Sequence, residues 1–198
     1  MKSGFESVVK ERRSIRTLGK SDAVTREKLE KILRLVLYAP SAYNAQTSRL
    51  VVLTDDANEK FWDIAERALR KVTPPDAFAR TQKKLDGFRG GNGTILFYED
   101  TAATEKLKKD FPLYEDKFEQ WAQHNNAMLE YAVWLALSEH GIAASLQHYN
   151  PLVDADAAKE WNIPGSWTLI AQMPFGKAEE QAPPKSFMPF EERVQFYE

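Results

Sequence analysis

The most concentrated chemistry in this sequence lies near its amino terminus, where the segment RRSIR spans residues 12–16. Arg12, Ser14 and Arg16 alternate along this segment, so in an extended backbone their side chains would point to one side. A guanidinium group offers five donors and keeps its charge when partly buried, and the serine hydroxyl adds another donor. Such a row suits a phosphate or another anion with several oxygens. The alternatives are a solvated basic patch and arginines that cap the end of a helix.

A second polar segment, PSAYNAQ, occupies residues 40–46. Ser41, Asn44 and Gln46 carry small hydroxyl or amide side chains, which can hydrogen-bond the edge of a polar ring. The competing interpretation is an ordinary turn led by Pro40. These residues taken alone do not decide between the two interpretations.

The overall composition excludes several classes of protein and of site. The chain has 198 residues, a net charge of −2 and a pI near 6.0, whereas a nucleic-acid-binding domain usually has a basic surplus. The absence of cysteine excludes disulfides, thiolate metal ligands and a cysteine nucleophile. His124, His140 and His148 lack the spacing of metal ligands, so we expect no metal site. The sequence also has no GxGxxG segment, no P-loop and no GxSxG elbow.

The apolar runs predict a protein that contacts no membrane. The first residues, MKSGFESVVKERRS, lack the apolar core of a signal peptide. No apolar run approaches the length that spans a bilayer. We therefore expect a cytoplasmic protein that binds neither membranes nor nucleic acids.

Apolar periodicity predicts one domain over residues 1–198 in which helices alternate with strands. Residues 76–89 would form a helical turn or two, and the tail at about residues 178–198, rich in proline and charge, would form an arm. Short helices are predicted at residues 4–12 and 154–163, and longer ones at residues 25–38, 56–72 and 114–140. Strands are predicted at residues 50–54, 94–100, 142–149 and 166–176. The class is therefore α/β or α+β with a central sheet.

The long predicted helix 114–140 is apolar around its circumference. Between Ala127 and Leu137 the only charged residue is Glu130, and a helix that is apolar on every side must be covered on every side. A second copy of the chain could cover the faces that one chain leaves open, which favours a homodimer. The other interpretation is a central helix wrapped by the sheet and helices of a single monomer.

Four segments in this order resemble the nitroreductase family of FMN-dependent NAD(P)H oxidoreductases. They are RRSIR, APSAYNAQ, GIAASLQHYNP and IAQMPFG, and the resemblance runs from roughly Phe5 to Phe190. The short chain and its LQHYNP segment look most like the branch with the bacterial copper-induced nitroreductase and the fungal fatty-acid-repression proteins. The resemblance implies an α+β (α/β-like), nitroreductase-like fold. Its central, mostly antiparallel sheet would be flanked by helices, and the long helix would lie at a dimer interface.

By the same resemblance, the amino-terminal segment would hold FMN. Arg12 and Ser14 would bind its phosphate and ribityl side, and Arg13 would donate through its backbone or side chain. Arg16 would reach N1 and O2 of the flavin ring. A cation at that edge would stabilise the negative charge that two-electron reduction leaves on the ring.

The polar loop after the second predicted helix matches a family loop that reaches FMN held mainly by the partner subunit. The residues that the resemblance assigns to this contact are Ser41, Asn44 and Gln46. A site built in this way would exist only in the dimer.

A third set of residues would lie against the reactive part of the ring. Gln147, His148 and Tyr149 match the segment over the flavin N5 face, where backbone N–H groups would bond N5. Lys185 resembles a family lysine that contacts the phosphate. The arginine that some relatives carry two residues later is Phe187 here.

The resemblance implies a flavoenzyme that passes two electrons from NADH or NADPH to nitroaromatic or quinone acceptors by a ping-pong mechanism. Water would supply protons at an open site, so no side chain is assigned as catalytic. An alternative is a flavin-binding stress or lipid-signalling protein with little turnover. A third is a colourless interaction protein whose arginines are only surface charge.

Overall fold

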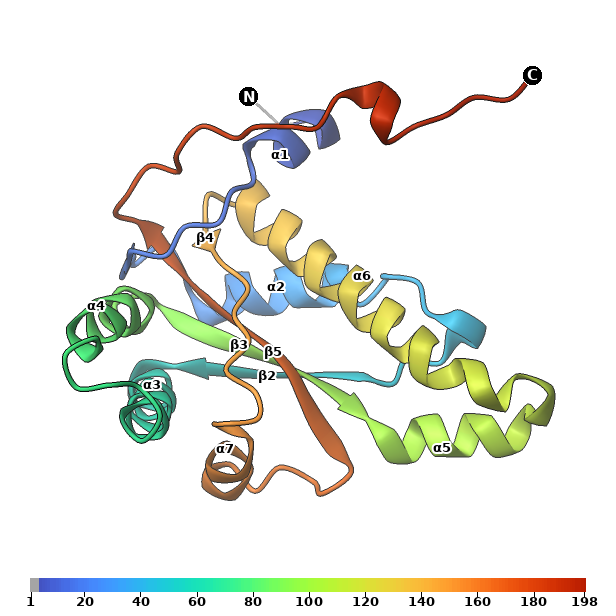
Figure 1. Cartoon of the computed structure of the whole chain (residues 1–198), viewed down its shortest axis with the longest axis horizontal. Coiled ribbons are helices and arrows are strands. Elements are labelled where there is room, and N and C mark those ends of the chain that lie inside the picture. Colours follow the sequence, from blue (N-terminus) through green and yellow to red (C-terminus); the bar gives the residue numbers. More distant parts are fainter. Residues whose placement is uncertain (1–3) are drawn as a thin grey trace.

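A central sheet with helices on both faces makes up the computed structural model, which describes residues 4–198 (Figure 1). The helices are α1 (Phe5–Glu11), α2 (Arg26–Val36), α3 (Asp55–Arg70), α4 (Phe78–Arg89), α5 (Thr101–Asp110), α6 (Phe118–Glu139) and α7 (Asp154–Glu160). The strands are β1 (Leu18–Gly19), β2 (Ser48–Thr54), β3 (Gly93–Asp100), β4 (Ala143–Ala144) and β5 (Trp167–Ala178). Short 3-10 turns are η1 (Ala42–Asn44), η2 (Pro112–Lys117) and η3 (Phe190–Glu192).

Strand β5 pairs with three other strands of the sheet, β1, β3 and β4. The strand order is β1-β5-β3-β2, with β4 also paired to β5, and each of these pairs is antiparallel. A bulge between Phe97 and Tyr98 shifts the register of β3 against β5. The arrangement confirms the predicted α+β class with a mostly antiparallel sheet between helices.

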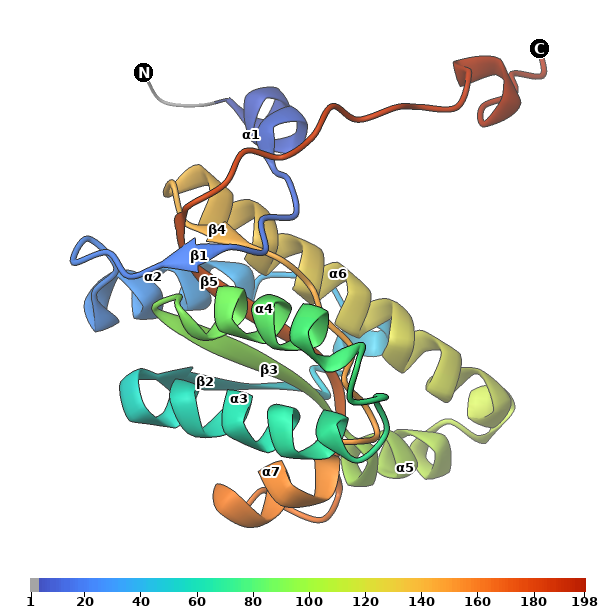
Figure 2. The same cartoon turned by 60° about the vertical axis from the view of Figure 1, so that its left-hand side comes forward.

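Each face of the sheet packs against its own group of helices. Ile95 and Phe97 of β3 face α2 and α6, whereas Leu96 and Tyr98 face α3, α4 and α7. Neighbouring residues of a strand point to opposite faces, so a strand covered on both sides is apolar at every position. This explains the uninterrupted apolar run that predicted β3. Figure 2 shows α3 and α4 on the opposite side of the sheet from α2 and α6.

The structure contains one helix that the sequence pattern did not predict and another that is longer than predicted. No element was predicted at residues 101–110, which form α5, and residues 78–89 form a full helix rather than a turn or two. Thr104 is the one buried residue of α5. A helix that buries so little has no apolar periodicity to reveal it.

Two other predicted elements are shorter. The strand expected at residues 142–149 consists of β4 and of an isolated bridge between Gln147 and Gln172, and Ala144 of β4 also forms a bridge with Ser14. Ser145 donates its N–H to the Pro174 carbonyl oxygen at 3.3 Å, and Gln147 exchanges bonds with Gln172, so the chain follows the edge of β5 as far as Gln147. The helix expected from residue 114 begins at Phe118, because residues 112–117 form the 3-10 turn η2.

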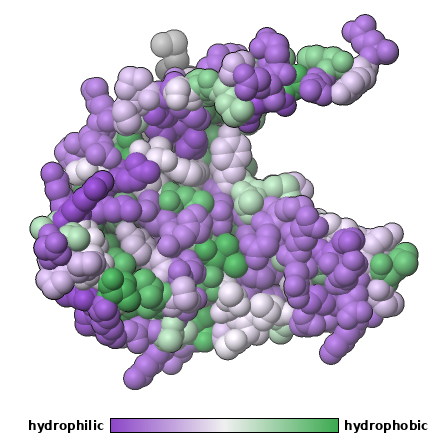
Figure 3. All heavy atoms as spheres, viewed as in Figure 1, coloured by the Kyte–Doolittle hydropathy of each residue, from purple (hydrophilic) through white to green (hydrophobic). Residues whose placement is uncertain are grey.

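Residues 179–198 form an extended arm that leaves the body after β5 and passes beside α1 (Figures 1 and 2). Its exposed large apolar side chains are Phe187, Met188, Phe190, Val194, Phe196 and Tyr197. Figure 3 shows the arm projecting beyond the body, with an open notch beneath it. Among residues 4–198, no helix has the length and apolar character needed to cross a membrane.

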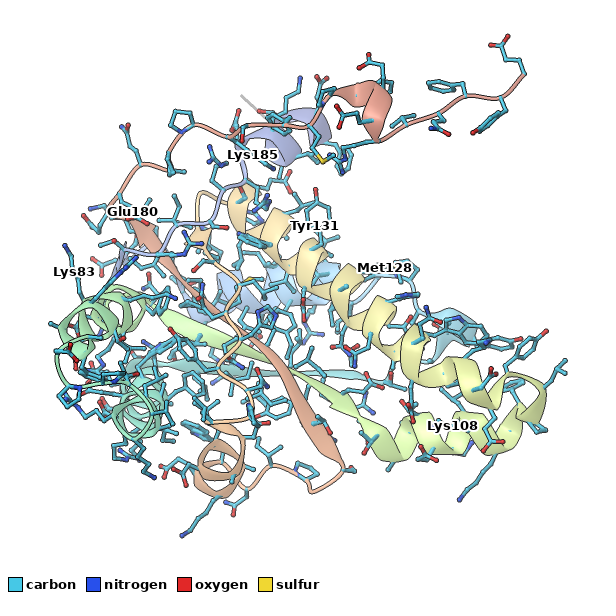
Figure 4. All side chains as sticks on the ribbon, in the orientation of Figure 1. Lys83, Lys108, Met128, Tyr131, Glu180 and Lys185 are labelled. Atoms are coloured by element: carbon cyan, nitrogen blue, oxygen red, sulfur yellow. The ribbon has the colours of Figure 1, made fainter. Side chains whose placement is uncertain are left out.

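Helix α6 leaves part of its apolar surface uncovered. Leu129, Val133 and Leu137 are buried against the sheet and α2. Met128 and Tyr131 are 39% and 44% exposed, and Figure 4 places both on the side of α6 turned away from the sheet. One chain therefore covers this helix on one side and leaves the other open.

Candidate functional site

The amino-terminal arginines lie on an extended segment beside β4. Ile15 donates its N–H to the Ala144 carbonyl oxygen at 3.0 Å, and Ser14 pairs with Ala144 in a parallel bridge. Ile15 is buried, Ser14 is half-buried and Arg16 is exposed. The segment therefore alternates as expected, with Ile15 turned into the core and its two neighbours turned outward.

Arg12 lies over the indole of Trp134 from α6, with its guanidinium carbon 4.3 Å from the ring centroid. Arg12 Nε and Trp134 Nε1 are buried, and neither has a hydrogen-bond partner within residues 4–198. Both residues line a cavity of about 420 Å³, together with Arg13 and the first part of the arm at Gln181. Two unused N–H donors beside a second arginine favour a ligand rich in acceptor oxygens.

The first residues of the arm are tied to the arginine segment. Glu180 Oε1 accepts the Arg16 N–H at 2.6 Å, and Glu180 Oε2 accepts the Thr17 hydroxyl at 2.9 Å. These bonds, above all that from the Arg16 N–H, hold the pKa of Glu180 below its ordinary value. Arg13 also donates through Nη2 to the Pro183 carbonyl. The arm thereby fixes the backbone of Arg16 while the Arg16 side chain stays exposed.

Lys185 lies two residues beyond this contact and close to α1 (Figure 4). It is exposed, and its Nζ lies 5.0 Å from the ring centroid of Phe187. In the described part of the chain, no hydrogen bond joins Lys185 to the arginine segment. The arm brings it to the same end of the molecule without fixing it there.

The residues expected over a flavin ring are attached to the buried strand β5. Gln147 and Gln172 exchange backbone N–H···O bonds of 2.7 and 2.9 Å, and the Tyr149 N–H donates to Gln172 Oε1 at 2.8 Å. The Tyr149 ring packs against the core on the α3 face, where burial raises its pKa to about 12. Of the three predicted residues, His148 is the exposed one. Gln147 and Tyr149 are turned into the protein, and His148 faces solvent.

The loop that carries Ser41, Asn44 and Gln46 is held by α6. Ser41 Oγ accepts the Gln46 N–H at 3.1 Å, and Asn125 Oδ1 of α6 accepts the N–H of residue 42 at 3.0 Å. Tyr43, Asn44 and Gln46 have φ values of 56°, 52° and 48°, in the left-handed region. This backbone leaves Asn44 and Gln46 exposed.

Tyr43 fixes the same loop through its ring. Its centroid lies 4.7 to 5.9 Å from those of four other rings, which belong to Phe111, Tyr114, Phe118 and Trp121. Ring pairs at these separations attract each other beyond the area that they bury. The unusual backbone of the loop is thus stabilised by contacts with α6 and the turn before it.

One chain does not bring this loop to the arginine segment. Asn125 holds the loop and Trp134 holds Arg12, and the two positions are nine residues apart on α6. At the rise of an α-helix, that separation is about 14 Å along the axis. The arginine segment, the start of the arm and residues 145–150 are gathered at β4 and β5, whereas the loop lies elsewhere.

Two buried polar residues near this site were not predicted. Glu130 of α6 is 8% exposed, its Oε1 has no partner among residues 4–198, and burial raises its pKa to about 7. Gln172 is the buried amide within the apolar strand segment IAQMPF. In each case the available signal was one polar residue inside an apolar element. The described His, Asp and Glu side chains form no group of three that could hold a metal ion.

The comparisons with known proteins agree with this fold. Residues 9–177 match the model of the nitroreductase family. The nitroreductase CinD from Lactococcus lactis, in complex with chloramphenicol, is 39% identical with a TM-score of 0.89, over 98% of this chain and 100% of that chain. The complex of CinD with 4-nitrophenol gives a TM-score of 0.88.

Curated relatives come from Saccharomyces cerevisiae. The nitroreductase-like protein HBN1 is 33% identical over 77% of this chain and 76% of its own length. The nitroreductase FRM2 is 32% identical over 75% of this chain and 73% of its own length. A nitroreductase with bound FMN from Desulfitobacterium hafniense shares the fold alone, with 19% identity and a TM-score of 0.74 over 100% of both chains. The family match over most of the sequence, together with these relatives, shows that the chain belongs to the nitroreductase family.

Proposed function

We propose that this protein is an FMN-dependent oxidoreductase that passes two electrons from NADH or NADPH to nitroaromatic or quinone acceptors by a ping-pong mechanism. The observation that carries the proposal is the pair of unused donors on Arg12 and Trp134 at a basic cavity of about 420 Å³. An FMN phosphate has the oxygens that such donors need. The nitroaromatic acceptors are supported by the CinD structures, which hold chloramphenicol and 4-nitrophenol.

The residues around this cavity fit FMN by their chemistry. Arg12, Arg13 and Ser14 would bind its phosphate and ribityl chain, and Lys185 would add a cation from the arm. Arg16, with its backbone fixed by the arm and its guanidinium exposed, would lie at the N1 and O2 edge. Bound FMN would supply a ring that accepts a hydride equivalent and later releases two electrons. Arg16 would favour the reduced ring because its positive charge offsets the charge gained on reduction.

A second subunit would complete the site. The loop with Asn44 and Gln46 lies about 14 Å along α6 from Arg12 in its own chain, so its exposed amides are free to serve a neighbouring copy. Met128 and Tyr131 of α6 and the apolar side chains of the arm would be covered in the same contact. We therefore propose a homodimer in which each site takes residues from both chains. A monomer on gel filtration that retained FMN would contradict this assembly.

An absorption spectrum tests the proposed activity. The purified protein should be yellow, should bleach on addition of NADH or NADPH, and should recolour when a nitroarene or quinone is added. A yellow protein that neither bleaches nor recolours would instead be the flavin-binding protein with little turnover. A colourless protein that takes up no added FMN would refute both.

The variant Arg16→Ala tests the expected place of this guanidinium. Loss of the cation beside the ring should weaken FMN retention and slow flavin bleaching by NADH. Arg67→Ala is a matched control because Arg67 is an exposed arginine on α3, which carries none of the residues proposed to bind FMN. Unchanged FMN content and bleaching rate in Arg16→Ala would remove the proposed role of this residue.

A further inference from the structure

Gln172 lies within β5 and is completely buried, with 0% of its surface exposed. Its backbone exchanges N–H···O bonds of 2.7 and 2.9 Å with Gln147. Its side-chain Oε1 accepts the Tyr149 N–H at 2.8 Å, and its Nε2 donates to Asn150 Oδ1 at 3.0 Å. Gln172 therefore bonds the backbone of Gln147 and Tyr149 and the side chain of Asn150. In the described part of the chain it makes no hydrogen bond to His148, which lies between Gln147 and Tyr149 in the sequence.

A backbone carbonyl sets the direction of these bonds. Asn150 Nδ2 donates to the Leu169 carbonyl oxygen at 2.6 Å, so Asn150 must turn its Oδ1 toward Gln172. Gln172 then turns its Nε2 toward Asn150 and its Oε1 toward the Tyr149 N–H. An amide supplies the donor and the acceptor that this position requires, whereas a carboxylate supplies only acceptors.

One backbone N–H of residues 147–149 lacks an acceptor in the described part of the chain. The N–H groups of Gln147 and Tyr149 are both used by Gln172. Within residues 4–198, the His148 N–H has no such partner, and His148 is exposed. A free N–H between two fixed neighbours is a hydrogen-bond donor whose direction is set before any ligand arrives.

We propose that Gln172 is a positioning residue that presents the His148 N–H to N5 of the bound flavin. The inference rests on the proposed function, and it names both the donating N–H and the side chain that aims it. Because Gln172 occupies the N–H groups on either side, the segment cannot turn a neighbouring residue toward the ring. A donor of fixed direction at the atom that receives the hydride would orient the ring for transfer.

The variant Gln172→Met tests this role, because methionine has a similar length and lacks the amide. Gln120→Met is the matched control, since Gln120 is an exposed glutamine on α6. At equal FMN content, we expect Gln172→Met to slow flavin bleaching by NADH about tenfold or more, the scale set by one lost hydrogen bond. Amide hydrogen exchange at Tyr149, whose N–H loses its Oε1 acceptor, should accelerate by a similar factor, whereas the Gln147 N–H keeps the Gln172 backbone carbonyl. The control should match the wild type in both measurements.

Hydrogen exchange of the wild-type protein gives a second test that needs no variant. The His148 N–H should exchange fast in the FMN-free protein, and FMN should slow it about tenfold or more, as expected for a newly bonded amide. An exchange rate of the His148 N–H that FMN does not change would overturn the inference. A Gln172→Met protein that bleaches at the wild-type rate would overturn it as well. A wild-type protein that stays colourless with added FMN would refute the proposed function and this inference together. If Gln172→Met does not fold, the His148 measurement decides alone.

Discussion

Residues 145–150 and the loop at residues 41–46 are both expected to contact FMN, yet they are held in different ways. The first segment is joined to the buried strand β5 by the amides of Gln172 and its neighbours. The second rests on α6 through the rings around Tyr43 and one hydrogen bond to Asn125. The first attachment is complete inside one chain, whereas the second leaves its polar side chains facing outward.

The difference indicates that residues 145–150 are held in a fixed orientation, whereas the loop at residues 41–46 can adjust its position. Buried amide bonds are directional, and each partner that loses its bond carries a large penalty. Ring contacts at a half-exposed corner are less directional, so the rings can shift without leaving a polar group unpaired. The rigid segment would lie at the reactive face of the ring, and the adaptable loop would lie where the contact crosses between subunits.

The variant Asn150→Ala should break the rigid attachment with the largest effect. It removes two hydrogen bonds and leaves the Leu169 carbonyl and Gln172 Nε2 unpaired in the core. We expect a loss of about 4 kcal/mol in the free energy of unfolding, measured by urea denaturation. His148→Ala is the control, because His148 is exposed in the same segment and should change stability by less than about 0.5 kcal/mol. Similar small losses in both variants would mean that these bonds do not hold the segment.

A pH series tests the buried carboxyl group of Glu130 on α6, the helix that holds the loop at residues 41–46. Burial raises the pKa of Glu130 to about 7, from 4.5 for an ordinary glutamate. Between these pH values the folded chain keeps a proton that the unfolded chain has lost, so the Glu130 contribution to stability falls as pH rises. Above pH 7, Glu130→Gln should therefore be more stable than the wild type by about 3 kcal/mol relative to their difference at pH 4.

Urea unfolding at pH 4, 6 and 8 checks this expectation, with Glu139→Gln as the control. Glu139 is an exposed carboxylate on the same helix and should leave the pH profile unchanged. If Glu130→Gln and the wild type follow parallel profiles, Glu130 does not ionise as its burial requires.

The variant Tyr43→Ala should affect the adaptable loop with a smaller cost to folding. Tyr43 is half-exposed, so the loss of its ring contacts should cost about 1–2 kcal/mol in urea denaturation. FMN affinity should fall about tenfold or more, because Asn44 and Gln46 would lose their orientation. Leu113→Ala, an exposed position at the same corner, is the control. An unchanged FMN affinity in Tyr43→Ala would remove this loop from the site.

The variant Tyr43→Phe should have the smallest effect. It keeps the ring that contacts Phe111 and Trp121, so stability should change by less than about 0.5 kcal/mol. FMN affinity should stay within about twofold of the wild type. A loss as large as that of Tyr43→Ala would assign the attachment to the hydroxyl group rather than to the ring contacts.

Much of the fold could be predicted because its signals are local. The segment TILFYED is apolar at nearly every position because both faces of β3 are covered, and it was predicted as a strand. Thr25 was a recognisable helix start, and its Oγ1 accepts the Lys28 N–H at 3.2 Å. By contrast, α5 buries almost nothing and left no pattern to find.

The candidate site was predictable as a set of residue types and much less so as an arrangement. The donors of the segment RRSIR predicted an anion site, but nothing near Arg12 in the sequence indicated that its guanidinium group would lie over Trp134. The loop at residues 41–46 reads as an ordinary polar turn. Its left-handed residues are stabilised by rings between Phe111 and Trp121, far along the chain.

Residue types and short-range spacing were thus enough to indicate the class of fold, the chemistry of the arginine segment and the family resemblance. The folded chain alone placed Arg12 over Trp134 and aimed Gln172 at Tyr149 and Asn150. Helix and strand preferences act over a few neighbouring residues and leave a trace in the local pattern. The direction of a buried hydrogen bond depends on which distant groups the packing brings within reach, and no local pattern records that.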